Sequence, residues 1–326
     1  MTQEIRHKEL APPRVPTVAL ALGGGGARGL AHILMLEVFD ELGIKPTVIA
    51  GTSIGALYGA AYASGLNARQ IRAYTEEILG RRFDLVRQLF AARSEPVQRL
   101  LRVLPVRSSL LNSATLLDLV FPGQVAKDFS HLQIPLKVVA TDLSSHEATV
   151  LDAGPLRPAV AASIAIPVLF SPVIIGGRTL VDGGLANPLP FDLIDGAADI
   201  TVAIDVNAKT ATADLGLRPT AVEVIVQSIQ ILQKSVTRER LRYRQPDVLI
   251  EVAVDFGALE FTKPHEILAA AKPAKAELMR ALQQALGIEH SVHAVTLREE
   301  SPLPAVPEKA RRRVSIRSLG ARRKTP

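Results

Sequence analysis

A serine held between two glycines is the residue of this 326-residue chain best suited to nucleophilic chemistry. The stretch Gly51-Thr52-Ser53-Ile54-Gly55 fits the pattern Gly-x-Ser-x-Gly, in which a sharp turn from a strand into a helix exposes the serine hydroxyl. Glycines on either side remove Cβ atoms that would clash in such a turn. Serine is also a good helix N-cap, so the pentapeptide alone leaves both a nucleophile and a cap open.

A run of four glycines, Gly23 to Gly26, lies upstream and continues as Ala27-Arg28-Gly29. A dinucleotide site through Gly24, Gly26 and Gly29 would need an acidic residue at the end of the next strand, and none is there. A Walker A loop would need Gly-Lys-Ser or Gly-Lys-Thr, which is also missing. The remaining interpretation is an oxyanion hole, built from backbone N–H groups that no side chain covers.

A serine nucleophile needs a base, and the seven histidines are weak candidates for it. His265 and His293 follow the serine in the chain, as in common serine hydrolases, but neither follows an obvious strand. Asp182 ends a predicted strand within Val181-Asp182-Gly183-Gly184, where a carboxylate could contact the serine directly. Asp142 and Asp205 also end predicted strands, so spacing alone does not choose among the three carboxylates.

These motifs sit on a pattern in which strands and helices alternate. A buried strand is expected at 17–22, an amphipathic helix within 27–43, a second strand at 47–50 and a helix over 54–63. This alternation predicts a parallel sheet with helices on its faces, so both glycine turns should lie at the same carboxyl edge. Later helices are expected over 68–79, within 84–120, before Pro167, and over 220–243 and 265–286. Later strands are expected over 135–143, 147–153, 199–206 and 247–254, and a hairpin is expected over 172–184.

The composition is that of a globular chain with a large core, because 48% of the residues are hydrophobic and 21% are charged. The absence of cysteine excludes disulfides, thiolate catalysis and cysteine-bound zinc. With no tryptophan and 4% aromatic residues, binding of nucleic acid by base stacking is disfavoured. We expect neither a metal nor another cofactor.

Positive charge is concentrated in two segments. Residues 307–326 hold eight Lys or Arg against Glu308, a charge of +7, so the rest of the chain sums to −1 within the net charge of +6. Residues 81–107 hold seven arginines interleaved with Leu, Val and Phe, as in a basic amphipathic helix. A solvated surface is the favoured interpretation of each segment, and peripheral contact with anionic lipid is the alternative. For the tail, a weak contact with nucleic acid is a third possibility.

No segment reads as a signal peptide or as a membrane-spanning helix. The first 16 residues lack an apolar stretch, and the weakly polar window 158–175 contains three prolines. We therefore expect a cytoplasmic protein that is at most peripheral at the inner membrane surface.

Four blocks occur in a specific order: LALGGGGARGLAH, AGTSIGALYGA, ASIAIPVLFSPV and VDGGLANPLP. Together they resemble the patatin-like phospholipase family, including its bacterial branch related to the neuropathy target esterases, and ATDL at 140–143 fits the bacterial members. The resemblance implies a three-layer α/β/α sandwich with a mainly parallel sheet. It divides the chain into a flexible leader over 1–16, a catalytic core over 17–207, helices and a strand over 208–298 that complete the domain, and a disordered basic tail over 299–326.

The resemblance also implies a catalytic Ser-Asp dyad without histidine, with Ser53 as nucleophile and Asp182 as general base. Amides around Gly24, Gly25 and Gly26 would form the oxyanion hole. Arg28 matches the basic residue of the glycine-rich block, where it either braces the loop or meets a phosphate. The other motif positions are Gly29, Gly51, Gly55, Gly183 and Gly184.

The family acts on acyl esters of lipids. The resemblance therefore implies a carboxylic-ester hydrolase of phospholipase A or lysophospholipase type, working through an acyl-Ser53 intermediate. Two other classes stay open: a lipid acyltransferase that uses the same serine and glycine elements, and a non-catalytic membrane or regulatory scaffold. Head-group preference, acyl length and oligomeric state are not set by the sequence.

Overall fold

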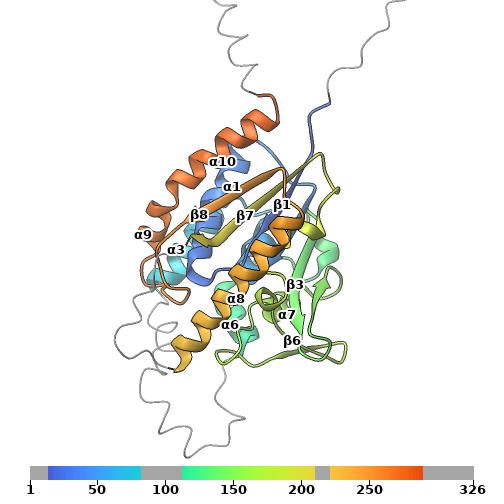
Figure 1. Ribbon diagram of the computed structural model, residues 1–326, viewed down its shortest axis with the longest axis vertical. Coiled ribbons are helices and arrows are strands. Elements are labelled where there is room, and N and C mark those ends of the chain that lie inside the picture. The colour runs from blue at the N-terminus through green and yellow to red at the C-terminus, as the bar shows by residue number, and fades with distance from the viewer. Residues whose placement is uncertain (1–13, 82–111, 210–220, 289–326) are drawn as a thin grey trace, which may run out of the picture. The chain divides into compact units, whose positions relative to one another are not determined.

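The computed structural model describes residues 14–81, 112–209 and 221–288. The described helices and strands belong to one unit that ends at Leu286 (Figure 1). None of the helices in these ranges combines the length and the apolarity needed to cross a bilayer. The leader to residue 13, the basic segment over 82–107 and the tail over 299–326 lie outside the described residues, so what was expected of them stays a prediction.

The core of the unit is an eight-stranded sheet with the order β5-β6-β3-β2-β1-β7-β8, and β4 pairs with β3. β3, β2, β1, β7 and β8 run parallel to one another. β4 and β6 each pair antiparallel with β3, and β5 pairs antiparallel with β6. The predicted α/β architecture with a mainly parallel sheet is therefore confirmed. The strands are β1 (Val18–Leu22), β2 (Val48–Thr52), β3 (Leu136–Asp142), β4 (Glu147–Leu151), β5 (Val173–Ile175), β6 (Arg178–Asp182), β7 (Ile200–Lys209) and β8 (Val248–Ala253).

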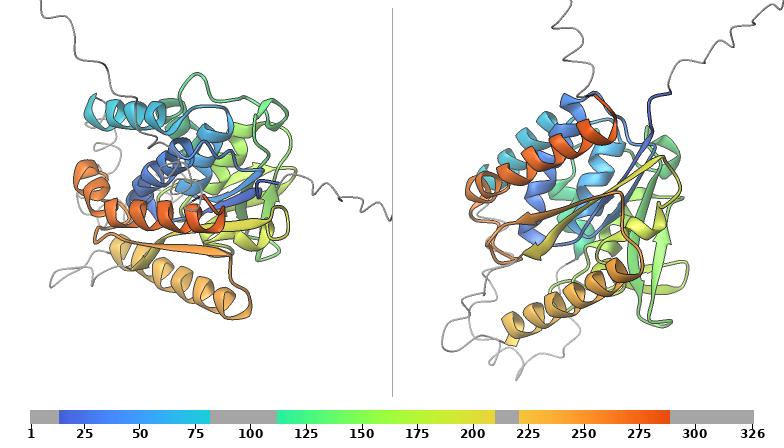
Figure 2. Two further views of the ribbon diagram at one scale, coloured as in Figure 1. Left: turned by 90° about the horizontal axis from the view of Figure 1, so that it is seen from above. Right: turned by 45° about the horizontal axis from the view of Figure 1, so that its top comes forward.

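Helices cover the two faces of this sheet unequally. Of the described α-helices, only α8 (Ala221–Tyr243) lies against one face, as Figure 2 shows. The other face carries the remaining helices: α1 (His32–Glu41), α2 (Ile54–Ala63), α3 (Ala68–Arg81), α6 (Ser113–Val120), α7 (Leu156–Ser163), α9 (Pro264–Ala270) and α10 (Lys272–Ala285).

The sequence of β1, VALAL, shows how the two faces are filled. Val18, Leu20 and Leu22 belong to the main core beneath the larger helical layer. The two alanines of β1 belong to a smaller core on the other face, which the segment 189–194 and Leu241 of α8 complete. Since both faces are covered, the strand reads as a continuous apolar run, as is usual in parallel sheets.

The structure corrects three details of the sequence prediction. The helix expected over 265–286 is two helices, α9 and α10, because Pro273 has no backbone N–H with which to continue the hydrogen bonds of α9. The first helix begins as a 3-10 turn over Gly26–Ala31 and becomes α1 only at His32. Asp205 lies within β7 and not at the end of the strand.

Candidate active site

Two strands meet end to end on one edge of β3, and the candidate residues lie at their junction. β2 pairs with β3 as far as Thr52 opposite Val139, and β6 pairs with β3 from Asp182 opposite Ala140. Because β4 occupies the other edge of β3, β2 and β6 must share this one. Ser53 follows Thr52 directly, so the sheet register brings it against Asp182.

Ser53 adopts a strained backbone conformation between β2 and α2. Its φ of 54° and ψ of −123° lie where residues other than glycine are rare. By position it is the N-cap of α2, yet its side chain caps no amide of that helix. Instead, Ser53 Oγ donates a 2.6 Å hydrogen bond to Asp182 Oδ2. The sequence left open whether Ser53 is a nucleophile or a helix cap, and the structure shows that its hydroxyl does not cap the helix.

The glycines on either side of Ser53 have the steric role that the sequence predicts. A Cβ at Gly51 would lie 2.7 Å from the backbone nitrogen of Ala56, and a Cβ at Gly55 would collide with the carbonyl of Leu22 at the end of β1. Real Cβ atoms do not approach backbone so closely. The turn therefore packs directly against the end of β1, next to the glycine loop.

Asp182 is the carboxylate that contacts the serine, and it is buried. Its side chain is 3% exposed, and Oδ1 accepts a 2.8 Å hydrogen bond from the amide of Gly184. Burial raises the pKa of Asp182 to about 6, although the hydrogen bonds from Ser53 and Gly184 act in the opposite direction. The group is therefore mostly ionised at neutral pH and more basic than an exposed aspartate, which suits a proton acceptor.

The structure separates Asp182 from the other two candidate carboxylates. Asp142 accepts a 2.8 Å hydrogen bond from the amide of Ser144, and Asp205 accepts one of 2.8 Å from the amide of Asn207. In each case the partner is a backbone amide two residues further along the chain, not the hydroxyl of Ser53. The sequence could not make this choice, because all three carboxylates lie on strands.

The candidate histidines do not lie at the site. His265 is exposed at the start of α9, and His293 lies outside the described residues. Among the described residues that line the two cavities around Ser53, none is a histidine.

Ser163, at the end of α7, supports the junction although no motif singled it out. Its hydroxyl accepts a 2.8 Å hydrogen bond from the amide of Ser53 and donates a 2.6 Å hydrogen bond to the carbonyl of Val139. Thr141 acts similarly, because its hydroxyl donates to the backbone carbonyl of Asp182 at 2.9 Å. Both residues lie in blocks that the resemblance quoted, ASIAIPVLFSPV and ATDL, but spacing gave no sign of their partners.

The glycine loop after β1 presents backbone amides beside Ser53. The amide of Gly24 donates to the carbonyl of Pro188 at 2.9 Å, so this amide is already engaged, which corrects its expected place in an oxyanion hole. The amides of Gly25 and Gly26 have no acceptor among the described residues, and both glycines line a cavity together with Ser53. The candidate donors are therefore reduced to these two.

Two buried side chains hold the glycine loop. Arg28 Nε donates to the carbonyl of Gly25 at 3.2 Å, and His32 Nε2 lies 2.8 Å from the carbonyl of Gly23. Burial lowers the pKa of His32 to about 4, so the ring is neutral and Nε2 carries the proton of this hydrogen bond. Because a trans peptide is planar, fixing the carbonyl of Gly25 directs the following amide, that of Gly26, the opposite way.

Arg28 is 1% exposed, and burial lowers its pKa to about 10, partly offset by the nearby charge of Asp205. Its contact with Gly25 is a brace, one of the two roles that the sequence left open. Its Nη2 has no partner among the described residues, and the side chain lines a small cavity beside Ser53.

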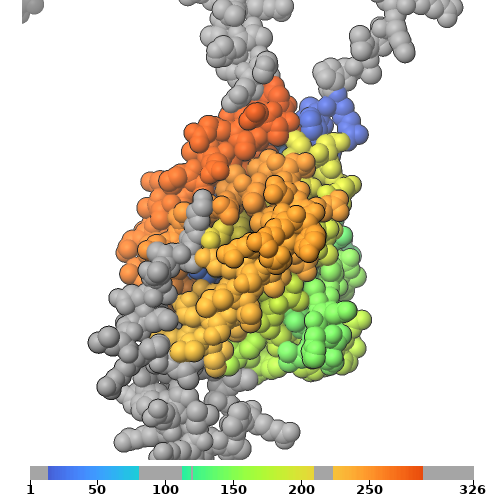
Figure 3. Space-filling model, viewed as in Figure 1, coloured from blue at the N-terminus to red at the C-terminus, as the bar shows by residue number. Residues whose placement is uncertain are grey.

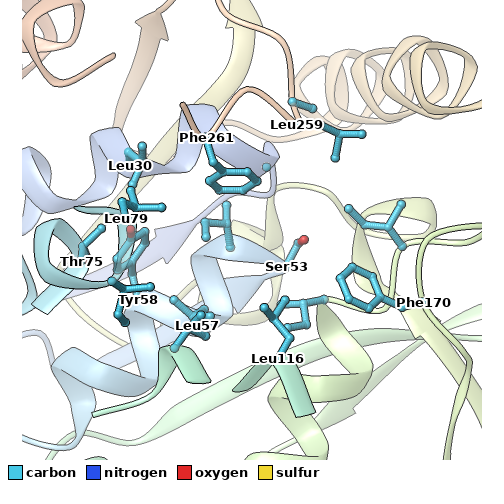
Figure 4. Close-up of a pocket in the computed structure, with 17 residues that line it drawn as sticks. Leu30, Ser53, Leu57, Tyr58, Thr75, Leu79, Leu116, Phe170, Leu259 and Phe261 are labelled. Carbon is cyan, nitrogen blue, oxygen red and sulfur yellow. The ribbon is translucent and has the colours of Figure 1, made fainter. Parts of the chain in front are cut away.

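An apolar cavity of about 130 Å³ begins at Ser53 (Figure 4). Of its lining residues in the described chain, only Ser53, Tyr58 and Thr75 carry polar side-chain atoms. Tyr58 and Thr75 are hydrogen-bonded to each other and lie away from Ser53, beside Leu79. The cavity therefore runs from the hydroxyl of Ser53 along an apolar wall to Tyr58 and Thr75, which are hydrogen-bonded to each other.

A smaller cavity of about 40 Å³ adjoins both Ser53 and Asp182. It is lined by Arg28 and by Gln230 and Gln233 of α8, in addition to the glycine loop. Gln230 Nε2, like Arg28 Nη2, has no partner among the described residues. The site thus has an apolar cavity and a second, smaller one that contains unpaired hydrogen-bond donors.

Comparison with known proteins identifies a family and several relatives. The family model for patatin-like phospholipase matches residues 20–195. An uncharacterized NTE family protein of Mycobacterium tuberculosis is 37% identical over 199 residues, which cover 60% of this chain and 51% of that protein. The chain therefore spans about half the length of this relative.

Two further matches are a human protein and a solved structure. Human patatin-like phospholipase domain-containing protein 6 is 33% identical over 201 residues, which cover 60% of this chain and 14% of that protein. Among solved structures, VipD from Legionella pneumophila matches 82% of this chain and 67% of its own, with 16% identity and a TM-score of 0.45.

The hydrogen bonds of Ser163 predict a measurable contribution to stability. Ser163→Ala should lower the free energy of unfolding by roughly 1–3 kcal/mol, because the amide of Ser53 and the carbonyl of Val139 would lose their buried partner. Urea denaturation measures this. Ser113→Ala is the matched control, since Ser113 is also buried but its hydroxyl has no partner among the described residues. Equal losses in the two variants would contradict the role assigned to Ser163.

The raised pKa of Asp182 predicts that this carboxylate destabilises the fold at neutral pH. The folded pKa of about 6 lies above the ordinary aspartate value of 3.8, so the folded protein binds the proton more tightly than the unfolded chain does. The contribution of this group to stability therefore falls as the pH rises from about 4 to above 6. Asp182→Asn removes that dependence while its amide can still bond to Ser53 and Gly184. The variant should be up to roughly 3 kcal/mol more stable than the wild type near pH 8.

Urea denaturation of both proteins near pH 4, 6 and 8 tests this. The stability difference should shrink towards pH 4. A difference that stays constant with pH would contradict a raised pKa.

Proposed function

The chain belongs to the patatin-like phospholipase family, and on that premise we propose that it hydrolyses the carboxylic acyl esters of lipids, with phospholipids and lysophospholipids as substrates. The observation that carries the proposal is the 2.6 Å hydrogen bond from Ser53 Oγ to Asp182 Oδ2 at an apolar cavity. A hydroxyl bonded to a buried carboxylate of raised pKa has the features of a nucleophile with its base.

In the first half of the proposed reaction, Ser53 Oγ attacks the carbonyl carbon of the ester while Asp182 accepts the hydroxyl proton. The tetrahedral adduct carries a negative charge on the former carbonyl oxygen. Its collapse breaks the bond between the carbonyl carbon and the alcohol oxygen. The departing alcohol takes the proton from Asp182, which leaves an acyl group on Ser53.

The negative charge of the adduct needs hydrogen-bond donors that are already in place. The amides of Gly25 and Gly26 are suited to this because they have no acceptor among the described residues. Arg28 holds the peptide between them, so its contribution to this step is to fix the direction of a donor. The N-terminus of α2, which starts directly after Ser53, adds a positive potential.

In the second half, water attacks the acyl carbonyl carbon while Asp182 accepts a proton from it. The bond between that carbon and Ser53 Oγ then breaks, and Oγ takes the proton from Asp182, which releases the fatty acid and restores the hydroxyl. The smaller cavity adjoins both residues, and about 40 Å³ holds one or two waters. The unpaired Nε2 of Gln230 can donate to such a water. A cavity of this size favours water over a larger acceptor alcohol, and therefore hydrolysis over acyl transfer.

The acyl chain is proposed to occupy the apolar cavity. Its volume of about 130 Å³ is close to that of protein cavities that bind benzene, so it encloses on the order of six carbon atoms. Longer chains would then extend beyond the enclosed part. A short soluble ester fits entirely and is the substrate of choice for testing the chemistry apart from lipid binding.

The dyad predicts that Ser53→Ala and Asp182→Asn each lower kcat/KM for p-nitrophenyl butyrate by roughly a thousandfold or more, because each removes a member of one catalytic unit. Wild-type kcat/KM should rise with pH and level off above about 6, as Asp182 ionises. Asp142→Asn is the matched control, since Asp142 is also a buried carboxylate at a strand end. Activity retained in either dyad variant with native circular dichroism would overturn the mechanism.

The acyl cavity predicts a change in chain-length preference for Leu79→Phe. The larger side chain fills the part of the cavity near Tyr58 and Thr75, so the enclosed acyl chain should shorten by about two methylenes. Since each buried methylene is worth about 0.8 kcal/mol, the octanoyl ester should lose roughly tenfold in kcat/KM, and the acetyl ester should be unaffected.

Leu42→Phe controls for general repacking, because Leu42 is a half-buried leucine outside this cavity. Mass spectrometry of the fatty acid released from a lysophospholipid and a diacyl phospholipid extends the test to lipids. An unchanged octanoyl-to-acetyl ratio in Leu79→Phe would place the acyl chain elsewhere.

A further inference from the structure

Helix α8 buries some of its polar side chains and exposes several large apolar ones. Gln230 and Thr237 face inward together with Val226, and these three side chains are at most 9% exposed. Ile231 and Leu232 are 64% and 61% exposed. A surface helix normally buries its apolar face and exposes its polar one. The outward face of α8 is therefore built for surroundings other than water.

The exposed residues form a continuous band, here called the α8 stripe. At 3.6 residues per turn its members lie within an arc of about 120°. Figure 3 shows α8 on the surface of the molecule. The members of the stripe are Val224, Ile225, Ser228, Ile231, Leu232 and Ser235.

The two serines of the α8 stripe do not make it polar. Ser228 Oγ donates to the carbonyl of Val224 at 2.8 Å, and Ser235 Oγ donates to the carbonyl of Ile231 at 3.0 Å. Their hydroxyl protons are satisfied by the helix's own backbone, which is how serine is accommodated in apolar surroundings. The stripe can therefore enter an apolar phase without leaving these donors unpaired.

The inward face of α8 lines the candidate active site. Ile229, Gln230 and Gln233 lie on the small cavity that also contains Ser53 and Asp182. Since a helix with its side chains is about 10 Å thick, whatever binds the α8 stripe lies about one helix diameter from the catalytic cavity.

The charges around the α8 stripe favour an anionic partner. Between 224 and 238 the chain contains Lys234 and Arg238 and no acidic residue; Glu223 and Glu239 flank this segment, and Glu239 is paired with Arg242 at 2.7 Å. In a two-fold contact between two copies of this chain, the stripe of one copy would face the stripe of the other. Lys234 and Arg238 of the two copies would then come close together, and the stripe contains no acidic residue to pair with them. Anionic lipid offers both an apolar interior and negative head groups.

We infer that the α8 stripe docks on the surface of an anionic lipid bilayer and holds the active site next to it. This rests on the proposed function, because a lipid hydrolase must reach esters at such a surface. The stripe lies outside the segments over 81–107 and 299–326 for which the sequence predicted lipid contact.

The test compares two isoleucines of equal exposure. Ile231 of the stripe and Ile174 of β5 are each 64% exposed. Full-length wild type, Ile231→Asp and Ile174→Asp are sedimented with vesicles of phosphatidylcholine and phosphatidylglycerol, at physiological salt and at high salt to screen the basic segments. Ile231→Asp should lower the partition coefficient roughly tenfold, because it removes an apolar side chain that would be buried in the bilayer and adds a negative charge. Ile174→Asp should change it less than twofold.

Hydrolysis of soluble p-nitrophenyl butyrate is measured in parallel and should be unchanged in both variants. Equal vesicle binding by the two variants, or no binding by the wild type, would overturn the docking proposal. So would a wild-type dimer that Ile231→Asp alone dissociates in analytical ultracentrifugation without any vesicle binding. Wild type that binds vesicles through Ile231 but does not hydrolyse the soluble ester would support docking and contradict only the proposed function.

Discussion

The hydrogen bond between Ser53 and Asp182 depends on the register of three strands. β2 ends opposite Val139 of β3, and β6 ends opposite Ala140, so the two side chains meet only because neither strand runs one residue further. In a strand, successive side chains point to opposite faces, so a slip of one residue would turn Asp182 away from the serine. The main core beneath the helical layer fixes this register, and in that sense packing far from the site positions its chemistry.

The site contains several features that oppose folding. Ser53 has a positive φ, Asp182 is buried with a raised pKa, and Arg28 is buried with an unpaired nitrogen. Such features persist only where the surroundings hold them in place. Here Ser163 binds the amide of Ser53, Thr141 binds the carbonyl of Asp182, and the sheet holds both ends of the junction. The residues that support the turn are thus as necessary to its geometry as the two that define it.

Much of the fold was readable from the sequence because its determinants are local. The run VALAL before four glycines, the alternation of strands and helices, and the serine turn each predict their own structure, and α2 has the expected bounds of 54–63. The break between α9 and α10 was missed although Pro273 gave a local signal for it. Boundaries of most other described elements differed from expectation by a few residues.

The parts of the site that could not be predicted depend on contacts between distant segments. The amide of Gly24 is not a free donor, because it is hydrogen-bonded to the carbonyl of Pro188. No residue near Gly24 in the chain indicates that contact. Asp182 is distinguished from Asp142 by strand register, which spacing does not encode. The family resemblance named Asp182 correctly as the partner that contacts Ser53, whereas residue types alone left the choice open.

The orientation of α8 likewise depends on contacts with distant segments and not on its local sequence pattern. Its sequence places isoleucine, leucine and valine on more than one side of the helix, and it does not show which side faces the sheet. Near Ser53 the inward side must meet a buried carboxylate and a cavity suited to water, and glutamine provides hydrogen-bond donors there. An apolar inward face would leave that cavity without these donors. With these polar residues facing inward, the apolar residues of the α8 stripe face outward, where a lipid surface would cover them.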